Sequence, residues 1–161
     1  MSLEQLFSLC STLALVGWLG LAFAPRWHIT RDWIAPVVAP MMIGAVYIWL
    51  MVNNFSSAPD GSGFGSLAGV KSLFSIPEIV LAGWIHYLAF DLFVGAWELK
   101  DAQKNGIHHL VMIPCLFATF MFGPGGLVLY WIIKFNICIY CNFIISDFTF
   151  YDFYFFASSY K

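Results

Sequence analysis

The stretch Ile76–Trp97, IPEIVLAGWIHYLAFDLFVGAW, decides the fold. It is almost entirely apolar over its length, but it carries His86 and Asp91 in its interior. As an α-helix it would be about 33 Å long, which matches a bilayer hydrocarbon core of about 30 Å. The stretch therefore predicts a transmembrane helix that contains an ionisable site.

Three further apolar runs lie on either side of this stretch, at residues 6–24, 34–52 and 110–133, and none contains a charged side chain. Over the 161 residues, 61% are hydrophobic and 10% are charged, whereas an ordinary soluble domain has roughly 25% charged residues. So few charges cannot supply the polar surface of a soluble domain. We therefore predict an all-α polytopic membrane protein, with a four-transmembrane-helix bundle in residues 1–134.

The two ends of the chain need separate interpretation. Residues 22–24 resemble a signal-peptide cleavage site, but Pro25 follows at once and Glu4 stands where a basic segment is typical, so we expect a retained first span. Residues 135–161 contain seven Phe and four Tyr but no Leu. We expect them to form an atypical aromatic tail outside the bundle. Cys138-x-x-Cys141 lies in this tail, and its apolar surroundings favour chance spacing over a redox motif.

Charged residues gather between the apolar runs. We expect a polar turn at residues 25–33 and a loop at residues 53–75, with a short interfacial helix near Leu67–Phe74 as the alternative. The cations Arg26, Arg31, Lys100 and Lys104 fall in the first and third loops, against Lys71 and Lys134 elsewhere. This weak bias places the first and third loops in the cytoplasm or stroma and both termini on the opposite side.

Asp91 is the most informative single residue, because an aspartate at membrane depth costs about 3 kcal/mol and demands a partner, a water cavity or a function. Helical spacing predicts two stripes on this span. One consists of Trp84, Tyr87, Asp91, Gly95 and Glu98, and the other of His86, Phe90, Phe93 and Trp97. Tyr87 can donate a hydrogen bond to Asp91 within the first stripe. The alternative is that Asp91 and His86 only bind neighbouring helices and fix their packing.

The run at residues 110–133 is interrupted by Gly123-Pro124-Gly125-Gly126. Pro124 has no N–H, so the carbonyl of Phe120 loses its usual helical partner. Counting from the preceding turn, we expect His86 to lie level with Met121 and Asp91 with Leu116. Interrupted spans are typical of membrane binding sites, although an ordinary proline kink is the alternative.

Several motifs resemble those of the neoxanthin-synthase-like family of small membrane proteins, which takes its name from a plant abscisic-acid-deficiency gene. The family resemblance covers about residues 3–133. It rests on Gly83–Trp97, Gly17-Trp18, Ala24–Trp27, Gly65–Val70, Leu73–Ser75, Pro114–Leu116 and Phe120–Pro124. The resemblance implies four membrane spans and a role like that of the plant members, which are needed to convert violaxanthin to neoxanthin.

We therefore expect a carotenoid-binding protein that isomerises a xanthophyll epoxide without a cofactor. This reaction needs an acid that protonates the epoxide oxygen and a base that removes a proton from the adjacent polyene carbon. We assign these roles to His86 and Asp91, in either order, with Tyr87 orienting them. Because they lie about 140° apart on the helix, we expect them to flank the ligand. The predicted substrate-binding residues are Trp84, Phe90, Trp97, Phe120, Gly123 and Pro124.

Other functions remain as alternatives. The chain could be a non-catalytic membrane module that binds pigment or lipid or assists a pathway enzyme, or a small proton-coupled transporter that uses His86 and Asp91. No metal or haem ligand pattern is recognisable, and a net charge of −2 without a basic cluster gives no reason to expect nucleic acid. Membrane lipid, a carotenoid or other long apolar ligand, and a second copy of the chain are the expected partners. The expected location is a bacterial inner membrane or a plastid membrane, and no transit-peptide pattern is recognisable.

Overall fold

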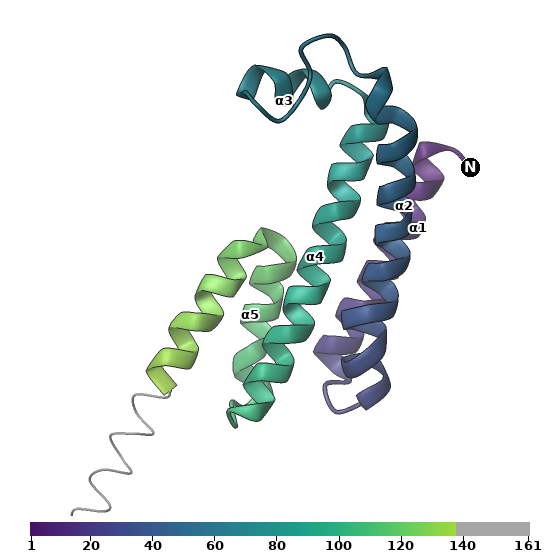
Figure 1. Ribbon diagram of the computed structural model, residues 1–161. Helices are drawn as coiled ribbons and strands as arrows, with labels where there is room; N and C mark the ends of the chain where they lie inside the picture. Colours follow the sequence, from purple (N-terminus) through teal and green to yellow (C-terminus); the bar gives the residue numbers. More distant parts are fainter. Residues whose placement is uncertain (138–161) are drawn as a thin grey trace, which may run out of the picture.

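The computed structural model describes residues 1–137, and every regular element in that part is helical (Figure 1). The elements are α1 (Leu3–Phe23), the π-helix η1 (Thr30–Val38), α2 (Ala39–Asn54), the 3₁₀ turn η2 (Phe55–Ser57), α3 (Leu67–Leu73), α4 (Pro77–Lys104) and α5 (His109–Phe122). A further helical run covers residues 124–137. The all-α prediction is therefore confirmed for this part of the chain. Most of the predicted aromatic tail, including Cys138-x-x-Cys141, lies outside the described residues.

Three helices are long and apolar enough to cross a membrane: Leu3–Phe23, Thr30–Ser57 and Pro77–Lys104. They correspond to the first three predicted spans, and the second and third extend further than the uncharged runs. The first begins with a capping box, in which the Ser2 hydroxyl accepts from the Gln5 N–H and the Gln5 amide oxygen accepts from the Ser2 N–H. This exchange satisfies backbone donors that would otherwise be orphaned at the helix start.

The second long helix begins in the segment predicted as a polar turn and contains a wide turn around Pro36. Residues Thr30–Val38 form a π-helix, and the Ala39 N–H donates to the Ile34 carbonyl five residues back. Pro36 has no N–H to give to the ordinary ladder, and a wider turn accommodates such a gap. The regular α-helix α2 resumes at Ala39.

The loop expected at residues 53–75 is partly helical. Leu67–Leu73 forms α3, where the Ser66 hydroxyl accepts from the Gly69 N–H at 3.0 Å and caps the start. The short helix, which was the alternative, is therefore correct, and the preference for an irregular loop is wrong. Leu73, the last residue of α3, is buried, so the helical spacing of the apolar residues in this segment reflects packing against the rest of the protein.

The fourth span predicted at residues 110–133 breaks at its expected interruption, and it forms two helices that run in opposite directions instead of one kinked span. α5 ends at Phe122, Gly123 adopts φ +51° and ψ −106°, and the chain then turns back (Figure 1). The returning helix brings Tyr130 and Lys134 to Asp101, near the end of α4 from which α5 started. Residues 109–137 thus form a helical hairpin whose tip is at Gly123. Glycine suits this tip because side chains disfavour a positive φ.

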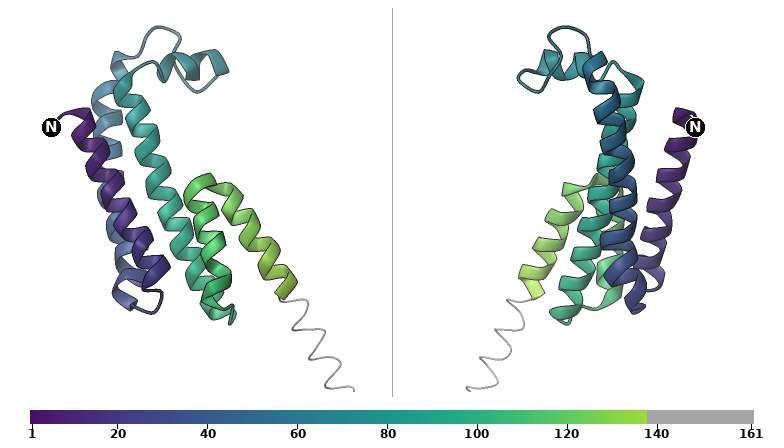
Figure 2. Two further views of the ribbon diagram at one scale, coloured as in Figure 1. Left: turned by 180° about the vertical axis from the view of Figure 1, so that it is seen from behind. Right: turned by 45° about the vertical axis from the view of Figure 1, so that its right-hand side comes forward.

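α4 is the central helix, in contact with α1, η1, α2 and α5 (Figure 2). Close approach between helices depends on small residues. A side chain at Gly95 would meet the Trp18 ring at 2.5 Å, and one at Gly17 would meet Leu92 at 2.7 Å. The hairpin packs on a third side of α4, away from α2. This arrangement gives α4 one face toward the hairpin and another toward α2.

Candidate functional site

The face of α4 toward the hairpin carries three residues of the first predicted stripe. Tyr87 contacts Phe120 near the end of α5, Asp91 contacts the tip, and Glu98 contacts Thr119 in the last turn of α5. Asp91 lies level with Gly123, seven residues beyond the expected Leu116. The shift arises because α4 continues for seven residues past Trp97, to Lys104, before the chain turns.

Asp91 is buried at the hairpin tip, with 8% of the residue exposed. Its Oδ2 atom is enclosed and has no hydrogen-bond partner among the described residues. A side chain at Gly123 would lie 3.0 Å from Oδ1, so the bare glycine backbone is what allows the hairpin to close over this carboxyl. A buried carboxyl oxygen without a hydrogen-bond partner lowers the stability of the fold, which makes Asp91 the strongest candidate for chemistry in the described part.

Tyr87 donates its hydroxyl hydrogen to the carbonyl of Phe120 at 3.0 Å. This is the carbonyl that Pro124 deprives of its helical donor, and Tyr87 replaces that donor from a neighbouring helix. Tyr87 also lies against Asp91, so its expected role beside that carboxyl stays a prediction. Through Phe120 it fixes the end of α5 one helical turn above Asp91.

Glu98 is a buried acid that the sequence interpretation placed only at a span end. It is completely buried, and both carboxylate oxygens lie 3.0 Å from the Thr119 hydroxyl. Gly126 permits this closeness, since a side chain there would lie 2.1 Å from the Thr119 backbone nitrogen. The position of Glu98, seven residues after Asp91 on the same helical face, is the sequence signal that could have identified it as a buried acid.

An apolar groove of about 590 Å³ opens above the hairpin tip, because α5 is too short to cover the upper part of α1 and α4. The lining residues are Ser11, Leu15, Val80, Gly83, Trp84, Tyr87, Leu88, Phe120 and Met121. Three of the predicted site residues, Trp84, Tyr87 and Phe120, thus line one cavity. The Trp84 indole N–H donates to the Ser11 hydroxyl at 3.3 Å across it.

His86 lies on the other side of α4 from this groove. It is exposed, stacks on Phe90 with ring centroids 4.6 Å apart, and lies 5.4 Å from the Tyr47 ring of α2. The structure therefore does not bring His86 and Asp91 to one site. Their separation of about 140° around the helix already pointed to different sides of α4. His86 and Phe90 belong to a separate groove between α2 and α4.

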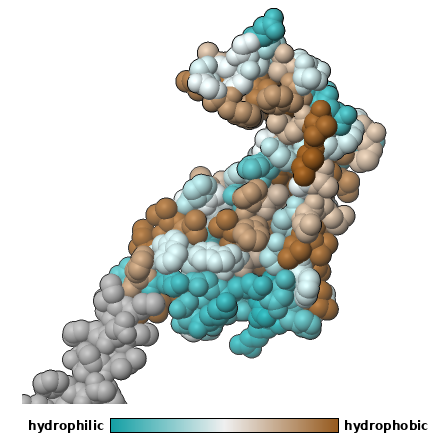
Figure 3. Space-filling model, viewed as in Figure 1, coloured by the Kyte–Doolittle hydropathy of each residue, from teal (hydrophilic) through white to brown (hydrophobic). Residues whose placement is uncertain are grey.

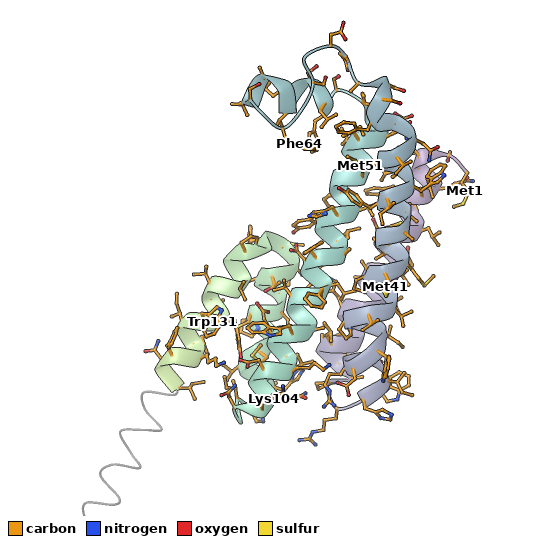
Figure 4. The ribbon with its side chains drawn as sticks, viewed as in Figure 1. Met1, Met41, Met51, Phe64, Lys104 and Trp131 are labelled. Carbon is orange, nitrogen blue, oxygen red and sulfur yellow. The ribbon has the colours of Figure 1, made fainter. Side chains whose placement is uncertain are left out.

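The remaining predicted residues divide between the tip and the returning helix. Gly123 and Pro124 form the tip against Asp91. Trp97 packs against Tyr130 and Trp131 of the returning helix, with ring centroids 5.9 Å and 6.1 Å apart (Figure 4, where Trp131 is labelled). Trp97 therefore supports the hairpin and does not line the groove. Within residues 1–137 no three His, Cys, Asp or Glu side chains are grouped so as to hold a metal ion.

Comparisons with known proteins cover most of this architecture. A family model described as ABA DEFICIENT 4-like matches residues 5–130, from α1 to beyond the hairpin tip. "Protein ABA DEFICIENT 4, chloroplastic" of Arabidopsis thaliana is 26% identical over an alignment of 139 residues, and the alignment covers 81% of this chain and 61% of the relative. The chain therefore spans about three fifths of the length of that relative. No solved structure matches.

Proposed function

Because this chain belongs to the ABA DEFICIENT 4-like family, we propose that it is a multi-pass membrane protein that binds a xanthophyll epoxide and isomerises it. The observation that carries the proposal is the apolar groove above the hairpin tip, together with the buried Asp91, whose Oδ2 atom has no hydrogen-bond partner among residues 1–137. Tyr87 links the two, because it lines the groove and precedes Asp91 by one helical turn.

The groove suits one end of a rigid polyene. Its walls are aliphatic and aromatic, and its polar atoms are limited to the Ser11 and Tyr87 hydroxyls and the Trp84 indole N–H. Such a lining favours a flat apolar chain with few oxygen atoms. A carotenoid is about as long as a bilayer is thick, so the rest of the polyene would extend along α1 and α4 into the lipid.

The family-level role and the geometry together favour a mechanism with one carboxyl in place of the expected His86–Asp91 pair. Asp91 in its acid form donates a proton to the epoxide oxygen, and the carbon–oxygen bond next to the polyene breaks. The resulting carboxylate then removes the proton from the adjacent polyene carbon, which forms the allene and restores the acid. Substrate and product are isomers, so the cycle requires no oxidant, reductant or cofactor. In this mechanism His86 has no direct part.

The membrane arrangement we propose is three spans and one re-entrant hairpin. α5 has 14 residues, or about 21 Å, which is too short for a bilayer core of about 30 Å. α4 covers the backbone break at the hairpin tip, as non-helical backbone at membrane depth requires. This arrangement moves Lys134 to the side of Arg26, Arg31, Lys100 and Lys104, so the charge bias is stronger than the sequence suggested. We place that side in the stroma of a plastid or the cytoplasm of a bacterium.

The test is the conversion of violaxanthin by membranes that contain the Asp91→Asn variant. We expect conversion to fall at least about 100-fold, with co-purified pigment and thermal stability retained. Asp60→Asn, the same change in an exposed loop, should convert like the unmodified chain. Normal conversion by a folded Asp91→Asn protein would overturn the catalytic proposal.

A second candidate function is pigment binding without turnover, and the separation of His86 from Asp91 favours it. Here Asp91 would serve only to hold the hairpin. In either case the groove must hold the ligand, so Ser11→Phe should reduce co-purified pigment several-fold, whereas Val16→Phe on the exposed side of α1 should not. Pigment that is bound in the unmodified chain but never converted would support this second candidate.

A further inference from the structure

Two further cavities lie on another face of α4, away from the apolar groove above the hairpin tip, which we call the xanthophyll groove. The stripe of His86, Phe90 and Phe93 continues along the same helical face, past Trp97 under the returning helix, to Lys100 and Lys104. The first three line an apolar groove, whereas the two lysines line a polar pocket at the end of the helix. One face of α4 therefore changes from apolar to cationic within two to three helical turns.

The polar pocket has a volume of about 290 Å³ and is lined by Arg31, Asp32, Lys100, Gln103 and Lys104. Asp32 pairs with Arg31 at 2.7 Å and with Lys100 at 3.2 Å. Lys104 has no acidic group within 4 Å among residues 1–137. Three cations thus face one carboxylate, and the pocket has a surplus of positive charge.

The apolar groove lies directly along the helix from this pocket, between η1–α2 and α4. Its volume is about 520 Å³, and its lining residues are Pro36, Pro40, Met41, Gly44, Tyr47, Ile48, His86, Ala89, Phe90 and Phe93. Tyr47 and His86 also line an adjoining cavity of about 410 Å³ that reaches Met51 and Phe64. Figure 4 shows the order along the molecule, with Lys104 at one end, Met41 between, and Met51 and Phe64 at the other.

The combined length of the apolar groove and the adjoining cavity fits a lipid tail. From Phe93 to Ile79 along α4 the distance is about 21 Å, comparable to an extended acyl chain. The hydrophilic end of the molecule, where the polar pocket lies, forms a continuous band in the space-filling view, with apolar surface above it (Figure 3). A molecule that occupied both parts would need an anionic head at that band and an apolar chain in the groove.

We propose that this face of α4 is a binding site for an anionic phospholipid. The phosphate group binds Lys104 and Lys100, beside Arg31, whose guanidinium donates to Asp32 and Gln103, and one acyl chain lies in the groove toward His86. Basic pockets beside transmembrane helices recognise anionic headgroups through such charge complementarity. A zwitterionic lipid fits less well, because its own ammonium would face the surplus of cations. This site is distinct from the xanthophyll groove and does not depend on it.

The test is the lipid composition around the purified protein in nanodiscs of phosphatidylglycerol and phosphatidylcholine, measured by native mass spectrometry. We expect the unmodified chain to retain phosphatidylglycerol preferentially. Lys104→Gln should lower this retention about fivefold, and Lys71→Gln, which removes a lysine at the far end of the molecule, should leave it unchanged. Equal retention of both lipids, or an equal loss in the two variants, would overturn the proposal.

A second pair of variants tests the acyl-chain part. A Cβ built at Gly44 meets no atom of another element within 4 Å, so Gly44→Leu extends into the groove, and Ala45→Leu places the same bulk outside it. Only Gly44→Leu should reduce phosphatidylglycerol retention. If inorganic phosphate at millimolar concentration displaces the bound lipid completely, or if Gly44→Leu has no effect, the pocket is an anion site and the lipid assignment is wrong.

Discussion

The three long helices and the hairpin are stabilised in different ways. α1, α2 and α4 meet mainly through apolar clusters, and the Trp84–Ser11 hydrogen bond is the main polar contact between them away from the polar end. The hairpin also packs on α4 through apolar residues, but it adds polar contacts along its length: Tyr87 with Phe120, Glu98 with Thr119, and Asp101 with Tyr130 and Lys134. The buried acids of α4 lie where the hairpin covers them.

This difference follows from the backbone. A continuous helix satisfies its own N–H and C=O groups and can be surrounded by lipid, whereas a chain that turns at membrane depth must be covered by protein. Turning at Gly123 also exposes polar groups that need partners, and α4 supplies them. The polar residues of α4 thus supply contacts for the hairpin, and the Oδ2 atom of one of them, Asp91, has no hydrogen-bond partner among residues 1–137.

The topology of the hairpin gives the largest expected effect, because the outcome is all or none. In a cysteine-free background, single cysteines at Asn105, Asn136 and Asp60, all exposed, would be labelled with a membrane-impermeant maleimide. We expect Asn105→Cys and Asn136→Cys to react from the same side and Asp60→Cys from the opposite side. A continuous fourth span would place Asn136→Cys with Asp60→Cys, which would contradict the hairpin.

Gly126→Ala should cost about 3 kcal/mol of stability or more, because the new methyl group would collide with the Thr119 backbone at 2.1 Å. Gly125→Ala is the matched control, since its nearest contact is Phe122 at 3.3 Å and alanine favours the helix by about 1 kcal/mol. Thermal unfolding in detergent measures both. Equal stability of the two variants would show that the hairpin does not close as described.

Thr119→Val should cost about 1–3 kcal/mol, because it leaves the buried Glu98 carboxyl without its donor. Glu98→Met removes the carboxyl, and the double variant Glu98→Met/Thr119→Val should recover most of the loss, because two apolar groups then meet. A double-mutant cycle of thermal stabilities measures the coupling. Additive losses would mean that Glu98 and Thr119 do not interact.

Much of the fold follows from the sequence, because three of the four uncharged runs are the long apolar helices of the structure. The stripe with Asp91 was also predictable, since helical spacing fixes which residues share a face. The hairpin was less accessible. Gly123-Pro124-Gly125-Gly126 signals a break, but a kink and a reversal have the same local sequence, and only the contacts of Tyr130 and Lys134 with Asp101 distinguish them.

The site was harder to predict than the helices. The end of α4 was misjudged by seven residues, because Lys100 and Lys104 are polar although they are still helical. That error moved Asp91 to the wrong level of α5 and left Glu98 at an apparent end of the span. The contact of Tyr87 also depended on the hairpin, because the Phe120 carbonyl that Pro124 leaves free had to lie within reach of α4.

Tyr130→Phe should give the smallest effect, about 1 kcal/mol. Tyr130 is completely buried and donates to Asp101, but Lys134 donates to the same carboxylate oxygen, so Asp101 keeps a charged partner when the hydroxyl is lost. The phenyl ring keeps its packing on Trp97. Lys134→Met in the same assay should cost more, because the carboxylate then loses its counter-charge. If Tyr130→Phe proved the more damaging of the two, the returning helix would be anchored by the hydroxyl and not by the ion pair, and the polar contacts of the hairpin would need a different order of importance.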